Sequence, residues 1–160
     1  MNLILLEPEE IQDNTVILRG RRARHIRKIL KSGKGDILRA GVTDGLMGQA
    51  EVMEIDRQAV ALSVTLNLQP EFCPRTDLIL AMPRPIMLKR VLAQATSLGV
   101  HSIFLINANR VEKSYFDATA LTDGSLREYL KAGLEQAVDT KVPEISIHHR
   151  FRPFVEDYLP

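Results

Sequence analysis

The spacing of hydrophobic residues along this 160-residue chain changes once, within the proline-containing segment 69–75. Before this segment, apolar and polar residues alternate, most clearly over 59–68, as they do in half-buried strands. After it, short apolar segments alternate with stretches in which apolar residues recur at helical spacing. A linker rich in proline is typical of a domain boundary. We therefore predict two domains, 1–70 and 71–160.

The first domain is predicted to be a small β structure. Turn residues separate its five predicted strands, which cover 2–6, 15–18, 35–40, 49–55 and 59–68. Asp44 and Gly45 predict a hairpin turn, because glycine adopts a positive φ angle without steric cost. Several short strands joined by tight turns are typical of a small β-barrel or sandwich.

The second domain is predicted to alternate strands with helices. The predicted strands cover 77–82, 102–106 and 142–148, and the predicted helices cover 85–98 and 125–138. This order predicts a parallel sheet with crossover helices. Three strands are few for an independent parallel sheet, so we expect this domain to be incomplete in the chain. We also expect residues 71–160 alone to associate through an exposed apolar edge.

The positive charge of the chain is concentrated in one segment. Nine Lys and Arg residues and one acid, Asp36, fall within 19–39, an excess of 9 − 1 = +8, whereas the whole chain carries +1. Nucleic-acid phosphate is the commonest partner of such a patch, and a solvated helix face is the alternative. The candidate RNA-binding residues are Arg21, Arg22, Arg24, His25, Arg27, Lys28 and Lys31.

The same segment predicts a short helix over 21–31 that ends at Gly33. Its apolar residues recur at helical spacing and should pack on the barrel, while the cations face outward; these apolar residues are Ala23, Ile26, Ile29 and Leu30. We see no second helix placed as in a helix-turn-helix, which disfavours a DNA-binding regulator.

Two loops follow strands of the predicted parallel sheet. Residues 81–85 follow the first strand and residues 107–114 follow the second. Loops at the carboxyl ends of parallel strands are where α/β folds place their sites. Arg84 and Arg110 are therefore candidates for contact with a substrate, and ordinary surface loops are the alternative.

Other patterns exclude several classes of function. Gly33-Lys34-Gly35 lacks the spacing of a phosphate-binding loop. His148 and His149 are adjacent in a predicted strand and would point to opposite faces, so we expect no metal site. Cys73 is the only cysteine, which fits a reducing, cytoplasmic compartment. No apolar run approaches the roughly 18–20 residues of a membrane span, and acids follow the apolar start at once, so we expect neither a membrane anchor nor a signal peptide.

The chain resembles the RsmE family of 16S ribosomal RNA uridine-N3 methyltransferases. Residues 25–31 are similar to the family's His-x-x-x-Val/Ile-Leu-Arg/Lys helix, and a Gly-containing turn and a strand follow. Leu98-Gly99-Val100 is similar to the end of its Glu-Leu-Gly-Val motif. Arg110 corresponds to the family's arginine in the loop after the next strand. Glu135-Gln136 and Val142-Pro143-Glu144-Ile145 are similar to the end of the following helix and the next strand.

The resemblance implies an α+β fold: an N-terminal PUA-like β-barrel that binds RNA, followed by an α/β SPOUT-type parallel-sheet domain. The family's knot binds S-adenosylmethionine, and its members are homodimers that act on the small ribosomal subunit. The chain departs from the family at Gln94, Ser97 and Val138-Asp139, and it lacks the Gly-Pro-Glu-Gly-Gly stretch. Most of the cofactor site is therefore expected outside this chain, and its cofactor-binding residues are not identified.

The predicted function is S-adenosylmethionine-dependent methylation of N3 of a uridine in 16S ribosomal RNA, by a chain that is a truncated form of the enzyme. Methylation needs an electron pair on N3, so a cation that stabilises the uridinate would help, and Arg110 and Arg84 are the candidates. The uridine must also leave its stack to be reached. The alternative function is a non-catalytic RNA-binding module.

Overall fold

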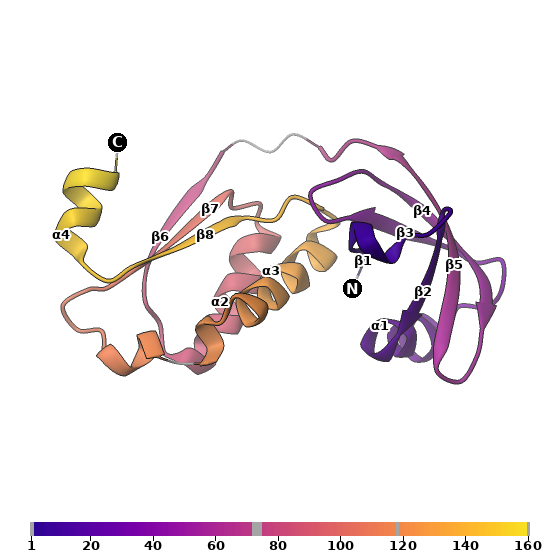
Figure 1. Cartoon of the computed structure of the whole chain (residues 1–160), viewed down its shortest axis with the longest axis horizontal. Helices are drawn as coiled ribbons and strands as arrows, with labels where there is room; N and C mark the ends of the chain where they lie inside the picture. Colours follow the sequence, from indigo (N-terminus) through magenta and orange to yellow (C-terminus); the bar gives the residue numbers. More distant parts are fainter. Residues whose placement is uncertain (1, 72–74, 118, 160) are drawn as a thin grey trace. The chain divides into compact units, whose positions relative to one another are not determined.

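The computed structural model describes residues 2–71, 75–117 and 119–159, and its contacts divide the chain into two compact units (Figure 1). The first unit consists of residues 1–71 together with 138–141, and the second of residues 72–137 and 142–160. The sequence placed the short segment 138–141 in the second domain, whereas its contacts belong to the first unit.

The first unit is built on a five-stranded sheet that curls around its own core (Figure 1). The strand order is β1-β3-β4-β5-β2; β1 pairs with β3 in parallel, and the other neighbours are antiparallel. Alternate side chains point inward and bury residues such as Leu18, Val52 and Leu62. The five predicted strands are confirmed, as β1 (Ile4–Leu6), β2 (Thr15–Arg19), β3 (Ile37–Val42), β4 (Met47–Ile55) and β5 (Ala59–Leu68).

A helical segment follows β2 and differs from the prediction in its second half. It consists of α1 (Gly20–His25) and a π-helical turn, η2 (Ile26–Leu30). Ala23 and Ile26 are buried as predicted, but Ile29 and Leu30 are 67% and 41% exposed. In a π-helix each residue advances by a smaller angle than in an α-helix, so residues after Ile26 rotate away from the core. The helix ends at Lys31, which has a positive φ of 54°, and not at Gly33.

The hairpin turn between β3 and β4 is confirmed, but a different residue makes it. The Gly45 amide donates to the Val42 carbonyl at 2.8 Å, which closes the turn. Asp44, and not Gly45, has the positive φ, at 56°. Aspartate tolerates this left-handed conformation better than most residues, because its short polar side chain bonds locally.

The segment 138–141 is part of the first unit through Thr140. The Thr140 side chain is fully buried, and its hydroxyl donates to the Gly45 carbonyl at 2.7 Å. The Asp44 amide donates to the Thr140 carbonyl at 2.8 Å. A Cβ at Gly41 would lie 2.5 Å from Thr140 Cγ2, so this contact requires a glycine in β3.

The second unit contains a parallel three-stranded sheet, as predicted. Its strands β6 (Asp77–Ala81), β7 (Ser102–Ile106) and β8 (Glu144–His148) lie in that order. The helices α2 (Pro85–Ser97) and α3 (Asp123–Ala137) cover one face of the sheet (Figure 1). Their apolar stripes bury the core with β7, through residues that include Leu88, Leu92, Ile103, Leu105, Leu126 and Leu130.

Short helical turns complete the second unit. The 3-10 turns η3 (Lys113–Asp117) and η4 (Thr119–Leu121) lie between β7 and α3. After β8 come α4 (Phe151–Pro153) and the π turn η5 (Phe154–Tyr158). The rings of Phe154 and Tyr158 each lie 5.7 Å from that of Phe104, on the central strand β7. A further turn, η1 (Pro8–Glu10), belongs to the first unit. No helix in the described ranges is long and apolar enough to cross a membrane.

Gly133 allows α3 to approach α2 closely, and this contact is testable. A Cβ at Gly133 would lie 2.5 Å from the Ala93 carbonyl oxygen and 2.5 Å from Thr96 Cβ. We expect Gly133→Ala to lower the free energy of unfolding by about 1–3 kcal/mol through overpacking, measured by thermal or urea denaturation.

Gly124→Ala, in the first turn of the same helix, is the matched control. Apart from its chain neighbours and the backbone of its own helix, no atom lies within 4 Å of the added methyl group, so stability should stay the same or rise by up to about 1 kcal/mol. Equal stability of the two variants would show that α2 and α3 do not meet at Gly133.

Candidate nucleic-acid interface

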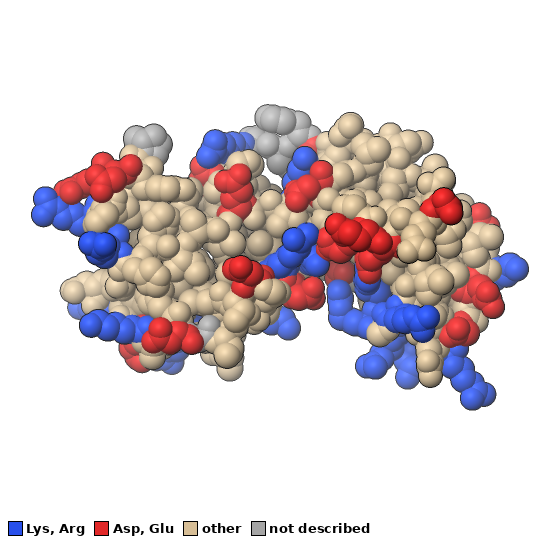
Figure 2. Space-filling view, in the orientation of Figure 1, with Lys and Arg blue, Asp and Glu red and all other residues tan. Residues whose placement is uncertain are grey.

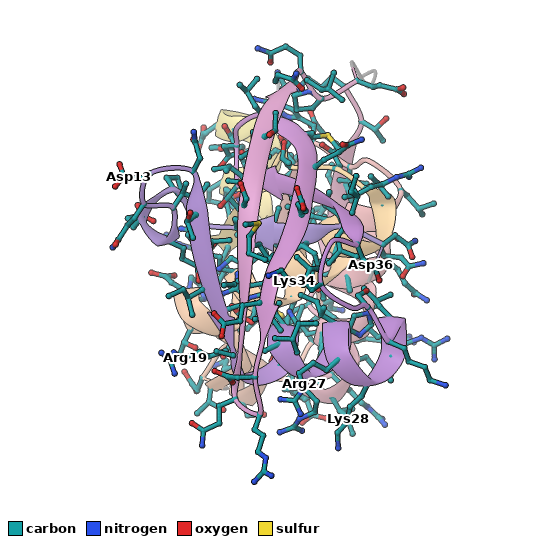
Figure 3. All side chains as sticks on the ribbon, turned by 90° about the vertical axis from the view of Figure 1, so that its right-hand side faces the viewer. Asp13, Arg19, Arg27, Lys28, Lys34 and Asp36 are labelled. Carbon is teal, nitrogen blue, oxygen red and sulfur yellow. The ribbon has the colours of Figure 1, made fainter. Side chains whose placement is uncertain are left out.

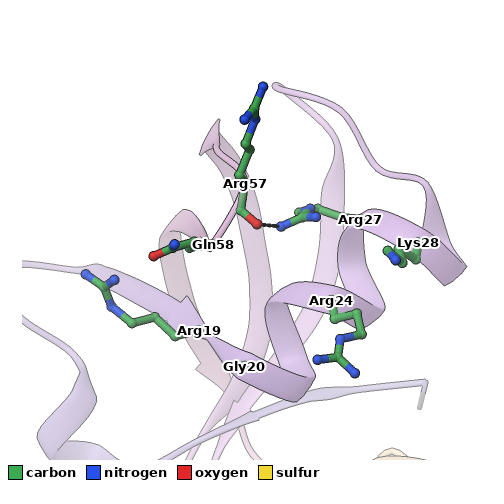
Figure 4. Close-up of a pocket in the computed structure, with 7 residues that line it drawn as sticks. All are labelled: Arg19, Gly20, Arg24, Arg27, Lys28, Arg57 and Gln58. Carbon is green, nitrogen blue, oxygen red and sulfur yellow. Dashed lines mark hydrogen bonds between the residues drawn. The ribbon is translucent and has the colours of Figure 1, made fainter.

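A basic pocket of about 420 Å³ lies in the first unit (Figure 4). Five of its seven lining residues are cations, and none is an acid. The lining residues come from the end of β2, from the helical segment α1–η2 and from the turn between β4 and β5; they are Arg19, Gly20, Arg24, Arg27, Lys28, Arg57 and Gln58. The alternative interpretation of the basic segment was a single solvated helix face. The basic pocket is instead concave and takes cations from three elements.

Strand pairing brings the three parts of the basic pocket together. In the antiparallel pair β2–β5, Arg19 lies opposite Ala59, so the end of β2 adjoins the start of β5 and the turn before it. The chain then leaves β2 at Gly20, whose φ of +60° is a left-handed conformation that glycine adopts without strain. The helix α1 therefore starts beside the β4–β5 turn.

The carboxylate of Asp56 fixes the β4–β5 turn. Its Oδ1 accepts hydrogen bonds from the backbone amides of Gln58 at 2.5 Å and Ala59 at 2.6 Å. These two donors hold the pKa of Asp56 below its usual value, and the charges of Arg19 and Arg27 lower it further. Asp56 is therefore ionised at neutral pH, with one oxygen occupied by the backbone of the turn.

Arg27 ties the helical segment to the same turn. Its guanidinium Nη1 donates to the carbonyl of Arg57, as Figure 4 shows. The other four cations of the basic pocket have no recorded side-chain hydrogen bond or ion pair within the part of the chain that the structure describes; they are Arg19, Arg24, Lys28 and Arg57. Their hydrogen-bond donors are available to a ligand.

The candidate RNA-binding residues lie in several different environments. Arg24, Arg27 and Lys28 line the basic pocket. Arg21 and Lys31 are exposed but do not line it. The cations gather over α1 (Figure 2), and Arg19, Arg27 and Lys28 lie at one end of the unit, away from Asp13 (Figure 3).

Arg22 and His25 are partly buried and have different surroundings. Arg22 forms an ion pair with both carboxylate oxygens of Glu10 and donates to the Leu5 carbonyl at 2.9 Å. Its side chain is 23% exposed, so it anchors α1 to β1 and η1. His25 is half-buried, and its Nε2 is buried without a hydrogen-bond partner among the described residues.

Sequence reasoning did not identify Arg57 and Gln58 as site residues. Arg57 lies 30 positions after Arg27, and neither Arg57 nor Gln58 belongs to a motif. Knowledge of the β2–β5 register would have found them, because it places the β4–β5 turn beside Arg19. Arg19 belongs to the basic segment, but it precedes the predicted helix.

In the second unit, Arg84 and Arg110 follow neighbouring strand ends. Ala81 of β6 lies opposite Ile106 of β7, so the two loops leave from the same edge of the sheet. Asn107 anchors the second loop to β8, since its backbone amide donates to the His148 carbonyl at 2.9 Å and its side chain to the His149 carbonyl at 3.1 Å. Both arginines are exposed, and no hydrogen bond connects their side chains in the described part of the chain.

A hollow of about 390 Å³ lies at the carboxyl end of β8, between this strand and η5. Its lining includes aromatic rings and both signs of charge, among them His148, Arg150, Phe154, Asp157 and Tyr158. It is open to solvent, whereas nucleoside cofactors are largely enclosed by their sites. These residues alone do not make a complete cofactor site.

The two adjacent histidines face different neighbours. His148 Nε2 lies 2.9 Å from the Ser146 hydroxyl, and the His149 ring packs on Phe116 at 4.9 Å between centroids. Within the described ranges, no cluster of three or more His, Cys, Asp or Glu residues could hold a metal ion. Cys73 lies outside the described residues.

Comparison with known proteins gives consistent matches. A family model described as an RNA methyltransferase domain matches residues 71–159. Ribosomal RNA small subunit methyltransferase E of Treponema pallidum (strain Nichols) is 33% identical over 162 residues, which cover 99% of this chain and 60% of the relative. Ribosomal RNA small subunit methyltransferase E 1 of Borreliella burgdorferi is 26% identical, over 92% of this chain and 61% of the relative.

The fold also matches a solved structure. A ribosomal RNA small subunit methyltransferase E from Neisseria gonorrhoeae, bound to S-adenosyl methionine, aligns with a TM-score of 0.69 and 16% identity. The alignment covers 99% of this chain and 66% of that chain. At this identity the match supports the fold alone.

The Arg22–Glu10 pair predicts a structural effect and not a ligand-binding effect. We expect Arg22→Gln to lower the free energy of unfolding by about 1–3 kcal/mol, because the half-buried Glu10 carboxylate loses its charged partner. Arg152→Gln is the control. Arg152 pairs with Glu156 at 2.8 Å but is 84% exposed, so its loss should cost less than about 1 kcal/mol. Equal melting temperatures for Arg22→Gln and the unmodified chain would contradict this role.

Proposed function

Because the chain belongs to the RNA methyltransferase domain family, we propose that it is part of an enzyme that methylates N3 of a uridine in 16S ribosomal RNA. S-adenosylmethionine is the proposed methyl donor, since the Neisseria gonorrhoeae relative binds it. The chain spans about 60% of the curated relatives that it matches, so we assign the reaction to the whole protein that carries it.

The observation that carries this proposal is the basic pocket of the first unit, in a chain whose second unit matches an RNA methyltransferase domain. An enzyme that modifies ribosomal RNA must hold a polyanion while its catalytic domain reaches one base. In the proposed division of labour, the first unit is a PUA-like RNA-binding domain and the second is a SPOUT-type methyltransferase domain. Contacts from the first unit to phosphates would set the position of the RNA without reading its sequence.

The proposed chemistry assigns roles to Arg84 and Arg110. Uridine N3 must lose its proton to become a nucleophile, and the resulting anion spreads over the ring and its carbonyl oxygens. A guanidinium held near these oxygens would stabilise that anion more than the neutral base. Both arginines follow strand ends at the edge of the sheet where parallel folds place their sites. The cofactor would supply the methyl group when bound, and the described residues do not enclose its site.

The proposed partners follow from the same assignment. The substrate is 16S ribosomal RNA in the small ribosomal subunit, and the whole protein is a homodimer that acts in the cytoplasm. A non-catalytic RNA-binding module is the competing proposal, since the basic pocket alone would serve it equally well.

Methyl transfer tests the proposal. The whole protein that carries this chain would be incubated with S-adenosylmethionine labelled in its methyl group and with small ribosomal subunits that lack this modification. Mass spectrometry of the nucleosides should then show labelled N3-methyluridine. Label in another nucleoside would contradict the assigned position. RNA binding without any label would favour the non-catalytic module.

Arg84→Gln and Arg110→Gln test the assigned roles in the same assay. Removal of one group that stabilises a developing anion lowers kcat by about 10²–10³, and we expect a loss of this order with little change in RNA affinity. Arg75→Gln is the control, because Arg75 pairs with Asp77 at the opposite, amino end of β6. Equal kcat for all three variants would exclude these catalytic roles.

A further inference from the structure

We infer that the basic pocket binds the sugar–phosphate backbone of RNA through Arg19, Arg24 and Arg57, and that Arg27 is a positioning residue that holds the β4–β5 turn in place. This inference rests on the proposed RNA-binding function of the first unit. It extends that function by assigning a site that spans three elements and by giving Arg27 a role other than phosphate contact.

The first argument is that three separate elements line one hollow. Arg19 comes from β2, Arg24 from α1 and Arg57 from the β4–β5 turn, and their guanidinium groups extend from the hollow in different directions (Figure 4). A basic helix that is merely solvated needs no cations from other elements. Here a turn that lies 30 residues along the chain adds an arginine to the same concave surface.

The second argument is charge. Five cations line the basic pocket without an acid among them, and the nearby Asp56 carboxylate, whose Oδ1 accepts from two backbone amides, offsets only one of their charges. Like charges held together repel each other, and an anionic ligand relieves that repulsion. Apart from Arg27, three of these cations are arginines, whose planar guanidinium groups bind phosphate oxygens in a bidentate manner.

The third argument is size and polarity. The volume of about 420 Å³ lies within the range of ordinary ligand sites and exceeds what one phosphate group needs. A segment of backbone with its ribose is therefore the better fit. Gln58 is the neutral polar side chain of the basic pocket, and its amide both donates and accepts hydrogen bonds. A ribose 2′-hydroxyl also does both, so Gln58 would favour RNA over DNA.

The fourth argument concerns Arg27. Its hydrogen bond to the Arg57 carbonyl and the Asp56 bonds to the turn amides fix the same three-residue turn from two sides. The Arg57 side chain extends from the tip of that turn (Figure 4). Loss of either restraint should misplace Arg57 without removing any phosphate-binding group.

The test is the binding of a fluorescein-labelled single-stranded oligouridylate and its deoxy counterpart, measured by fluorescence anisotropy at several salt concentrations. Arg57→Gln and Arg19→Gln should each weaken RNA binding about tenfold and reduce the slope of log K against log salt by about 0.7. Arg39→Gln, on β3 and outside the basic pocket, should leave both unchanged.

Two substitutions of Asp56 separate geometry from charge. Asp56→Asn keeps an Oδ1 acceptor for the turn amides and removes a negative charge, so RNA affinity should stay the same or rise. Asp56→Ala removes the same charge and also releases the turn, so affinity should fall. Equal gains from both variants would show that diffuse charge, and not a built site, attracts the RNA.

A double-mutant cycle tests Arg27. Arg27→Gln should weaken RNA binding with an unchanged salt slope, and Arg27→Lys, which can still donate to the carbonyl, should restore part of the loss. In the Arg57→Gln background, Arg27→Gln should add little, because the residue that it positions is already absent. Additive losses with a reduced slope would make Arg27 a phosphate ligand and overturn its positioning role.

The outcomes distinguish this inference from the proposed function. If the unmodified chain binds neither oligonucleotide, the RNA-binding function of the first unit fails. If it binds RNA but Arg57→Gln behaves as Arg39→Gln does, RNA binding stands and the basic pocket is not the site. If the deoxy probe binds equally well and Gln58→Ala changes nothing, the ribose contact is excluded.

Discussion

The position of the basic helical segment α1–η2 depends on two of its own arginines, which bond to other parts of the first unit. Arg22 pairs with Glu10 and fastens α1 to the first strand, while Arg27 bonds to the Arg57 carbonyl and fastens η2 to the β4–β5 turn. Burial of Ala23 and Ile26 supplies the apolar part of the same attachment. With these contacts made, the backbone segments that carry the remaining cations are held in place, which lowers the conformational entropy that a ligand would have to remove.

In the proposed function, the two units would divide the requirements of an RNA-modifying protein between them. The first unit concentrates positive charge at one end of a curled sheet. The second has a parallel sheet whose strand ends carry exposed arginines, and its sequence matches the RNA methyltransferase domain family. Gly133 and Gly41 serve close packing, within the second and the first unit respectively. These glycines have no part in the proposed chemistry.

Much of the fold could be predicted from the sequence, because apolar spacing alone distinguishes strands from helices. The strands of both sheets, α2 and α3 are confirmed, and the curated relatives confirm the RsmE resemblance. Features set by local backbone geometry were not predictable, such as the π turn that exposes Ile29 and the positive φ of Asp44. Arg57 and Thr140 needed tertiary contacts to identify them, since their partners lie 30 and 95 positions away in the chain.

The central claim is that RNA lies in the basic pocket between α1, β2 and the β4–β5 turn. Ultraviolet cross-linking of the protein to small-subunit ribosomal RNA, followed by mass spectrometry of the cross-linked peptides, tests this claim most directly. We predict cross-links in residues 19–28 and 56–59, the two segments that line the basic pocket or form its turn. Cross-links confined to other parts of the first unit, such as β3 or the segment 138–141, would contradict it.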